Sequence, residues 1–208
     1  MLLFAHTGIT LGAGVLIASL TARYFARRAA RPQKCSLASR DSDRQESNSP
    51  IPRESLLNHV DLRFLFVGSL LPDIIDKPIG HFFFRETFSN GRIFSHSLFF
   101  LVIISLIGYY VYKRYTKTWL LAISFGIFMH LILDQMWFNL HTLLWPILGF
   151  VFEKGDITDW LPSLILSLQT DPLVYVPELI GLLILVWFTV SLVHRRRFLD
   201  FLRFGRVR

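Results

Sequence analysis

Long apolar runs dominate the chain, and four of them are long enough to cross a bilayer. A membrane-spanning helix needs about 20 mostly apolar residues, because the hydrocarbon core is about 30 Å thick. The four runs lie at residues 1–22, 93–112, 119–138 and 173–193. A fifth run, residues 64–75, is shorter and contains Gly68 and Pro72. Since proline disrupts a helix interior, this run predicts a broken or half-span helix that continues through residues 79–84.

Two polar stretches interrupt this pattern. Residues 31–63 are rich in Ser, Arg, Asp, Asn and Pro, as expected of a linker with little apolar surface to bury. The linker contains Cys35, the single cysteine, so no internal disulfide can form. Residues 194–208 mix arginine with Phe and Leu, which predicts an interfacial helix on an anionic membrane surface. The pattern therefore predicts one domain over residues 1–208, an all-α polytopic membrane bundle with four full spans and one broken or half-span segment.

Composition agrees with a membrane protein. Hydrophobic residues make up 52% of the 208 positions and charged residues only 18%, against about 25% in soluble domains. These values exclude a disordered chain, a coiled coil and a disulfide-rich secreted module. In a chain this apolar, the net charge of +7 marks cytoplasmic loops, and we expect no nucleic acid partner.

The distribution of Lys and Arg predicts how the helices are oriented. Basic clusters follow the first and last apolar runs and separate the second run from the third. All three clusters lie on one side if the fifth run also crosses the membrane, and 18 of the 22 basic residues are then inside. The predicted outside holds Lys77, Arg85, Arg92 and Lys154. We therefore expect a multi-pass inner membrane protein with an extracytoplasmic N-terminus, a cytoplasmic linker and a cytoplasmic C-terminus.

Ionisable residues within the apolar segments are few, and each costs about 2.5–3.5 kcal/mol near the centre of a span. In the predicted topology they come from different segments but lie towards the outer leaflet. They are His6, Asp73, Asp76, His81, His96, His130, Asp134 and Glu178. His130 and Asp134 are four residues apart, so they share a helix face about 6 Å apart and can hold one metal ion. With His6, Asp73 and His96 they form a ligand set suited to zinc or a similar divalent ion.

Simpler explanations exist for the same residues. His6 is also explained as a hydrogen-bonding residue between helices, and His130 with Asp134 as a structural ion pair or a proton relay. Asp76 is also explained as the ion-pair partner of the adjacent Lys77. Three further candidates are equally typical of a membrane interface: His81, Arg92 and Glu178.

Five short motifs occur in order along the first 150 residues. They are AHTGIT at 5–10, GSLLPDIID at 68–76, RIFSHSL at 92–98, HLILD at 130–134 and LLWP at 143–146. Together they resemble the motifs of the YdjM-like membrane-bound metal-dependent hydrolases. The resemblance implies a multi-pass helical protein with a divalent metal site, with zinc as the expected ion. Carried across residue by residue, it implies a motif arginine at Arg92 and ligands at His6, Asp73, His96, His130 and Asp134.

This sequence departs from the family pattern in two places. Lys77 stands where a histidine would follow the second aspartate, Asp76, and Gly91 stands where the middle motif would begin with a histidine. The missing histidine argues against a full multi-metal site. The family also resembles, distantly, the zinc-dependent phospholipase C and P1-type nucleases. This analogy favours phosphoester hydrolysis as the chemistry.

These observations predict a membrane-embedded metal-dependent hydrolase that acts on a phosphoester of a lipid or lipid-linked substrate at the outer leaflet. A bound metal makes hydroxide available near neutral pH. We expect Asp76 to serve as general base or as a further ligand, and Arg92 to bind a phosphate. The expected partners are membrane lipids, and the basic inner surface could dock a cytoplasmic protein.

Two other functional classes fit part of the pattern. Ser95-His96-Ser97 and the His130/Asp134 pair are superficially similar to motifs of metal-free phosphatidic-acid-type phosphatases, although Ser124 stands where those enzymes carry an arginine. Activity that resists a chelator would favour that class. A non-enzymatic transporter or adaptor could use the same polar cluster for ions or for stability. Bound metal without turnover would favour that second class.

We predict that an impermeant thiol reagent applied to intact cells leaves Cys35 unlabelled, because the distribution of basic residues places the linker inside. The measurement compares labelling before and after permeabilisation. Labelling of Cys35 from outside would reject this orientation, and with it the outer-leaflet location of the candidate site.

Overall fold

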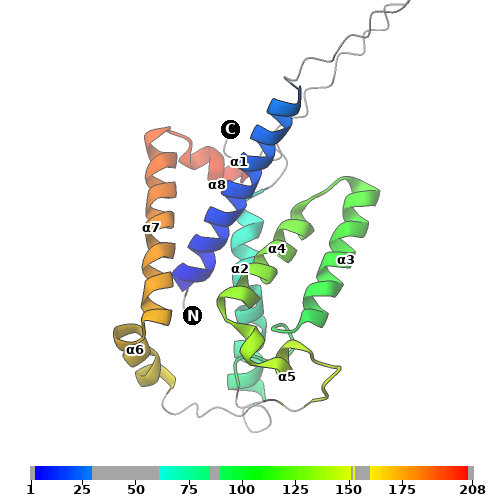
Figure 1. Cartoon of the computed structure of the whole chain (residues 1–208), viewed down its shortest axis with the longest axis vertical. Helices are drawn as coiled ribbons and strands as arrows, with labels where there is room; N and C mark the ends of the chain where they lie inside the picture. Colours follow the sequence, from blue (N-terminus) through cyan, green and yellow to red (C-terminus); the bar gives the residue numbers. More distant parts are fainter. Residues whose placement is uncertain (1–2, 30–60, 85–89, 151, 153–159, 206–208) are drawn as a thin grey trace, which may run out of the picture.

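The computed structural model describes residues 3–29, 61–84, 90–150, 152 and 160–205 (Figure 1). Within these ranges the chain is all-α and contains no strand, which confirms the all-α part of the predicted fold class. The elements are η1 (Ala5–Ile9), α1 (Thr10–Ala29), α2 (Arg63–Pro78), η3 (Ile79–Phe83), α3 (Leu98–Tyr115), α4 (Trp119–Leu133), η4 (Met136–Phe138), α5 (Leu140–Leu143), α6 (Trp160–Thr170), α7 (Pro172–His194) and α8 (Phe198–Phe204).

Helices α3 and α7 are long and apolar enough to cross a membrane, judged by length and composition. The apolar stretch Ala5–Thr21 and helix α4 are shorter. Two of the four predicted full spans therefore meet this criterion. Helix α4 ends at Leu133 because Gln135 adopts a left-handed backbone with a φ of 54°, and a short 3-10 turn follows.

The helices alternate in direction along the chain. In Figure 1, α1, α3 and α7 run towards one end of the molecule, whereas α2 and α4 run towards the other. The number of times that the chain crosses a membrane stays a prediction, since two helices meet the length and composition criterion. Which end faces outside stays a prediction, and residues 31–60 of the predicted linker lie outside the described residues.

Pro72 does not break its helix, which corrects the first alternative predicted for residues 64–75, a broken helix, while the half-span alternative stays a prediction. Helix α2 runs without interruption over 16 residues, includes both Pro72 and Pro78, and continues into the π-helical turn η3. The Pro72 side chain is fully buried, and the Ser95 hydroxyl donates a 2.9 Å hydrogen bond to the Pro72 carbonyl. Tertiary contacts of this kind override the local cost of a proline within a helix.

Helices α2 and α4 touch through their backbones at two glycines. A Cβ atom on Gly126 would lie 2.6 Å from the Ser69 nitrogen and 2.7 Å from the Gly68 Cα. A Cβ on Gly68 would lie 2.7 Å from the Ile123 Cα. Because neither residue carries a side chain, the two helices approach closely along the stretch that leads to Asp73 and His130.

The first helix crosses α7 in the same way. A Cβ on Gly8 would lie 2.6 Å from the Gly181 Cα, and one on Gly181 would lie 2.8 Å from the Ala5 Cα. This close crossing holds the π-helical turn η1 against α7, and it carries the fully buried His6 into the bundle.

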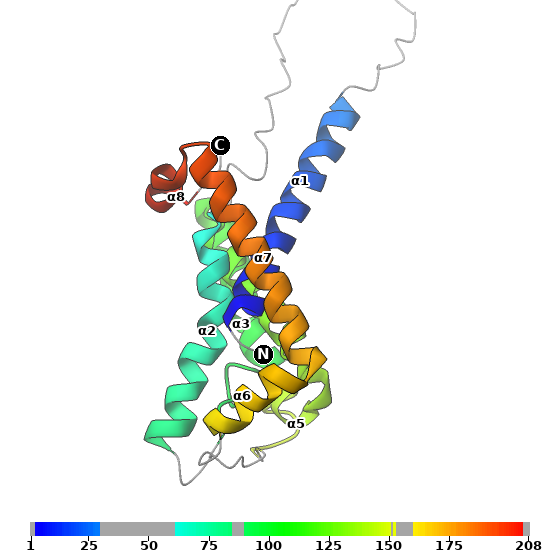
Figure 2. The ribbon, with the colours of Figure 1, turned by 90° about the vertical axis from the view of Figure 1, so that its left-hand side faces the viewer.

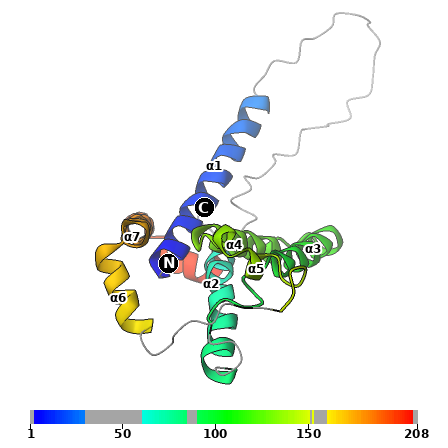
Figure 3. The ribbon, with the colours of Figure 1, turned by 60° about the horizontal axis from the view of Figure 1, so that its bottom comes forward.

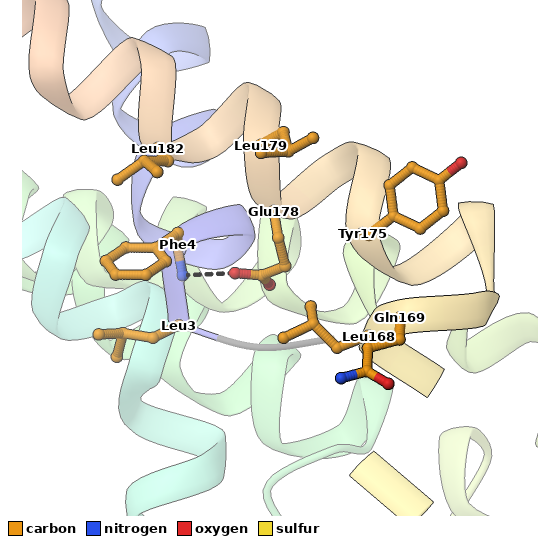
Figure 4. Close-up of a pocket in the computed structure, with 8 residues that line it drawn as sticks. All are labelled: Leu3, Phe4, Leu168, Gln169, Tyr175, Glu178, Leu179 and Leu182. Carbon is orange, nitrogen blue, oxygen red and sulfur yellow. Dashed lines mark hydrogen bonds between the residues drawn. The ribbon is translucent and has the colours of Figure 1, made fainter. Parts of the chain in front are cut away.

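Glu178 is buried near the start of α7, where its Oε2 accepts a 3.0 Å hydrogen bond from the Phe4 N–H. Both residues line an apolar cavity of about 590 Å³ between the start of the chain and helices α6 and α7 (Figure 4). Among the residues the structure describes, none of the predicted metal ligands lines this cavity. Glu178 therefore holds the beginning of the first helix against α7.

A hydrophobic core fills the end of the bundle where α2 and α4 begin and α7 ends. Its buried residues are Leu11, Leu62, Leu65, Ala122, Phe188, Leu192 and Phe201. Phe201 of α8 packs edge-on against Phe188, with ring centroids 5.4 Å apart. Arg63 donates hydrogen bonds to the Leu202 and Arg203 carbonyls at 2.9 and 3.3 Å. These contacts hold α8 across the end of α7 (Figure 2), while contact of this tail with lipid stays a prediction.

Helix α3 lies beside α4 at the edge of the bundle (Figure 3). Within α3 only Gly108 is buried, and the Ser105 hydroxyl lies 2.5 Å from the Ser124 hydroxyl of α4. The remaining surface of α3 includes many exposed apolar side chains, such as Phe99, Val102 and Leu106. A surface of this kind requires lipid or protein cover.

Replacing Gly126 by alanine should destabilise the protein, because the new Cβ would collide with backbone atoms of α2 that no side-chain rotation can clear. Overpacking of this kind costs about 1–3 kcal/mol, and we expect a lower thermal unfolding midpoint in detergent. Gly12→Ala is the matched control, since its Cβ would meet the flexible Ile184 side chain at 3.3 Å. Equal effects of the two substitutions would contradict the backbone contact between α2 and α4.

Candidate metal centre

Five predicted ligands from separate parts of the chain lie together inside the bundle. His6 comes from η1, Asp73 from α2, His96 from the loop before α3, His130 from α4 and Asp134 from the turn after α4. The three histidines are fully buried, and the side chains of Asp73 and Asp134 are only 16% and 4% exposed. We call these five residues the His/Asp cluster. Its grouping matches the predicted set, whereas the role of each residue as a ligand stays a prediction.

A hydrogen bond to the protein backbone fixes the tautomer of His130. Its Nδ1 lies 2.7 Å from the Ser69 carbonyl oxygen, in the buried contact between α2 and α4. A carbonyl oxygen can only accept, so Nδ1 must carry the proton. The Nε2 atom of neutral His130 therefore presents a lone pair.

A carboxylate orients His96 in the same sense. Its Nδ1 lies 2.7 Å from Asp76 Oδ2, and both side chains are fully buried. The carboxylate accepts a hydrogen bond from the Nδ1–H group of His96. When the ring is neutral, its Nε2 atom therefore carries a lone pair. A carboxylate behind a histidine in this way is the usual support for a metal-binding imidazole.

The two Nε2 atoms of His96 and His130 face each other at 3.1 Å. Two lone pairs at this distance repel each other unless a cation or proton lies between or beside them. Asp73 Oδ1 lies 3.6 and 3.9 Å from these two nitrogens, and Asp134 Oδ2 lies 3.9 and 4.0 Å from them. Donors bound tetrahedrally to zinc at about 2.0–2.2 Å are about 3.3–3.6 Å apart. The donor spacing of the cluster therefore suits one such ion after small adjustments.

His6 adds a further nitrogen donor. Its ring stacks on that of His130 with centroids 4.1 Å apart, and its Nε2 lies 3.2 Å from Asp134 Oδ1. Within the described part of the chain, neither ring nitrogen of His6 makes an aligned hydrogen bond. Buried polar atoms of this kind need a partner, and a metal ion beside Asp134 would supply one.

Asp76 lies behind His96 and not in the His/Asp cluster. Its two oxygens accept hydrogen bonds from the backbone N–H groups of Ile93, Ser95 and His96 at 2.7–3.3 Å, in addition to the bond from the His96 ring. A carboxylate engaged by this many donors is poorly placed to take a proton from water. The geometry thus favours a positioning role for Asp76 over the base or ligand role expected from the sequence.

Two cations bind the carboxylates of the cluster. Lys77 Nζ lies 2.8 Å from Asp73 Oδ2, and Arg92 Nε lies 2.9 Å from Asp134 Oδ2. Lys77 therefore pairs with Asp73, one helical turn away. The simpler explanation drawn from the sequence, an ion pair between Lys77 and its neighbour Asp76, is wrong. The reason is geometric, since residues four apart on a helix face each other whereas adjacent residues do not.

The loop that carries His96 is held from both sides. The Ser97 side chain caps α3 by accepting a hydrogen bond from the Phe100 N–H at 3.2 Å. On the other side, Phe94 packs edge-on against Trp145 and Phe152, with ring centroids 5.0 and 5.6 Å apart. Sequence reasoning did not identify this aromatic support, although Trp145 belongs to one of the five motifs.

The other histidines lie elsewhere. His81 belongs to η3, His141 is exposed on α5, and His194 is exposed at the end of α7. His59 lies outside the described residues. His194 ends α7, whose opposite end lies beside η1, so it provides a control for substitutions in the cluster.

We predict that His130→Ala and Asp134→Ala abolish binding of a divalent ion, because each removes a buried donor from the cluster. Asp76→Asn should weaken binding about 10–100-fold by disturbing the orientation of His96. Metal content of the purified protein, measured by mass spectrometry after dialysis, checks both. His194→Ala should retain the ion. Full metal content in His130→Ala would show that the cluster is an ion-pair network and not a metal centre.

Comparisons with known proteins agree with the geometry at the level of the family. No curated protein and no solved structure matches the chain significantly. The family described as YdjM inner membrane protein matches residues 1–199, which includes every residue of the His/Asp cluster. This match covers nearly the whole chain, and the protein therefore belongs to the YdjM inner membrane protein family.

Proposed function

We propose that this protein is a membrane-embedded metal-dependent hydrolase that cleaves a phosphoester of a lipid or lipid-linked substrate. The observation that carries the proposal is the 3.1 Å approach of His96 Nε2 and His130 Nε2, both oriented by buried acceptors so that their lone pairs converge. Together with two nearly buried carboxylates, this is the donor chemistry of a catalytic zinc site.

Each residue around the centre has a distinct task in this proposal. A zinc ion held by the cluster would supply a bound water with a pKa of about 7 and would polarise the phosphoryl group. Asp76 keeps His96 in the Nδ1–H tautomer through its 2.7 Å hydrogen bond. Arg92 binds Asp134 through Nε, and its side chain is 41% exposed, so its guanidinium can also contact a phosphate oxygen.

A lipid substrate is supported by where the cluster lies. It includes Asp73 from the second half of α2 and His130 from the last turn of α4, whereas the hydrophobic core that α8 covers lies where these two helices begin. His96 lies two residues before α3, which is long and apolar enough to cross a membrane, so the cluster lies beside one end of that helix, the depth at which a span meets lipid headgroups. The basic-residue distribution assigns this end to the outer leaflet.

The alternative of a metal-free phosphatase is less compatible with the geometry. That mechanism needs a histidine nitrogen free to attack phosphorus. His96 Nε2 instead faces His130 Nε2 at 3.1 Å, which occupies its direction of approach. A non-enzymatic transporter or adaptor remains the second candidate, because a metal ion in the cluster would also satisfy its buried charges.

The test measures release of phosphate or alcohol from short-chain phosphoester lipids by the zinc-loaded protein in detergent. We expect turnover that is lost on chelation, is restored by the metal and falls at least about 100-fold in His130→Ala. His194→Ala should stay active. Turnover that survives complete removal of metal would support the metal-free phosphatase instead. Stoichiometric metal without turnover on any phosphoester lipid would support the non-enzymatic class.

A further inference from the structure

Two half-exposed cations flank the buried His/Asp cluster. Lys77 Nζ binds Asp73 Oδ2 at 2.8 Å, and Arg92 Nε binds Asp134 Oδ2 at 2.9 Å. The side chains of Lys77 and Arg92 are 43% and 41% exposed, whereas those of their carboxylate partners are mostly buried. Each cation therefore joins a mostly buried carboxylate of the cluster to a partly exposed part of the protein.

Both cations serve the same centre although they come from different parts of the chain. Lys77 lies in the last turn of α2, and Arg92 belongs to the loop before α3. The carboxylates they bind lie 3.9 and 4.0 Å from one atom, His130 Nε2. Both cations are therefore paired with carboxylates that lie near the same histidine nitrogen.

The formal charge of the site changes sign when a divalent ion binds. Three carboxylates, those of Asp73, Asp76 and Asp134, face two cations, and neutral histidines add nothing, which leaves a net charge of −1. A divalent ion raises this to +1. The ion also draws electron density from Asp73 and Asp134, so their bonds to Lys77 and Arg92 weaken and the cations become available to an incoming anion.

We propose that Lys77 and Arg92 form a metal-dependent anion clamp for the dianion of a phosphate monoester, and this rests on the function proposed above. The two cations differ in kind, because an arginine binds two oxygens with its planar fork and a lysine acts as a point charge. A phosphate monoester has three terminal oxygens and so can meet the metal and both cations together. A phosphodiester has one charge and two such oxygens and satisfies fewer of these groups.

Lys77 is the residue that sets this preference in the present chain. The YdjM-like pattern places a histidine at this position, and a neutral imidazole would not contribute the same charge. With a neutral residue at position 77 the metal-loaded site would have no net charge. The clamp is therefore a specificity determinant added to the metal centre and not part of the ligand set.

Calorimetric titration of the full-length protein in detergent tests the clamp. The probes are inorganic phosphate, dihexanoyl phosphatidate and the phosphodiester dihexanoyl phosphatidylcholine, each added to zinc-loaded and to chelated protein. We expect inorganic phosphate and phosphatidate to bind the loaded protein at least about tenfold more tightly than the chelated one. Phosphatidylcholine should bind more weakly than phosphatidate. Tighter binding of phosphatidate than of phosphate identifies a lipid headgroup as the source, and equal binding identifies a free phosphate group.

Variants then assign the effect to the two side chains. Lys77→Gln and Arg92→Gln should each lower the affinity for phosphate about tenfold at unchanged zinc content, and Lys77→Arg should restore it. Lys113→Gln, at an exposed lysine on α3, is the control. Unchanged phosphate affinity in zinc-loaded Lys77→Gln overturns the clamp and leaves the proposed hydrolase intact. Loss of zinc in Lys77→Gln assigns the lysine to the metal centre and also overturns the clamp, whereas a wild-type protein without zinc overturns both proposals.

Discussion

The opposed nitrogens of His96 and His130 are the constraint on which the rest of this structure depends. Each ring is held by a buried acceptor, the Asp76 carboxylate on one side and the Ser69 carbonyl on the other. Neither ring can turn away without leaving that acceptor unsatisfied inside the bundle, which costs about 1–3 kcal/mol. The fold therefore keeps two lone pairs 3.1 Å apart, an arrangement that only a bound cation or proton makes favourable.

Close backbone contacts make this arrangement possible. The glycine contact between α2 and α4 brings the Ser69 carbonyl within 2.7 Å of the His130 ring, and a larger residue at Gly126 would remove it. The close crossing of Gly8 with Gly181 likewise brings His6 into the bundle. Small residues thus determine the geometry of the site although they have no chemistry of their own.

Much of the site could be predicted from the sequence because its strongest signals are local. The spacing of His130 and Asp134 places both on one helix face, and intramembrane ionisable residues are costly enough to be noticed. The all-α class follows from long apolar runs. The length of α4 could not be predicted, because its end depends on the backbone conformation of one residue, Gln135, within an apolar run.

Other features depend on contacts between distant segments. The Ser69 carbonyl carries no side-chain signature, so its bond to His130 is invisible in the sequence. The position of Asp76 behind His96 requires the loop at residues 92–97 to fold over the end of α2. Pro72 indicated a broken helix on local grounds, yet packing of α2 on α4 and the bond from Ser95 keep the helix continuous.

The arrangement of the two ends explains why a membrane bundle can tolerate so polar a centre. Apolar packing is concentrated where α8, Phe188 and Leu65 meet, so stability does not require an apolar interior at the other end. There, three carboxylates are balanced by Lys77, Arg92 and whatever cation the histidines hold. Because Lys77 and Arg92 are only half-buried, their ion pairs with Asp73 and Asp134 can weaken when a metal ion binds, and this change leaves the packed hydrophobic core untouched. In a site built in this way, a bound divalent ion both relieves the repulsion between the two histidine nitrogens and reverses the sign of the local charge.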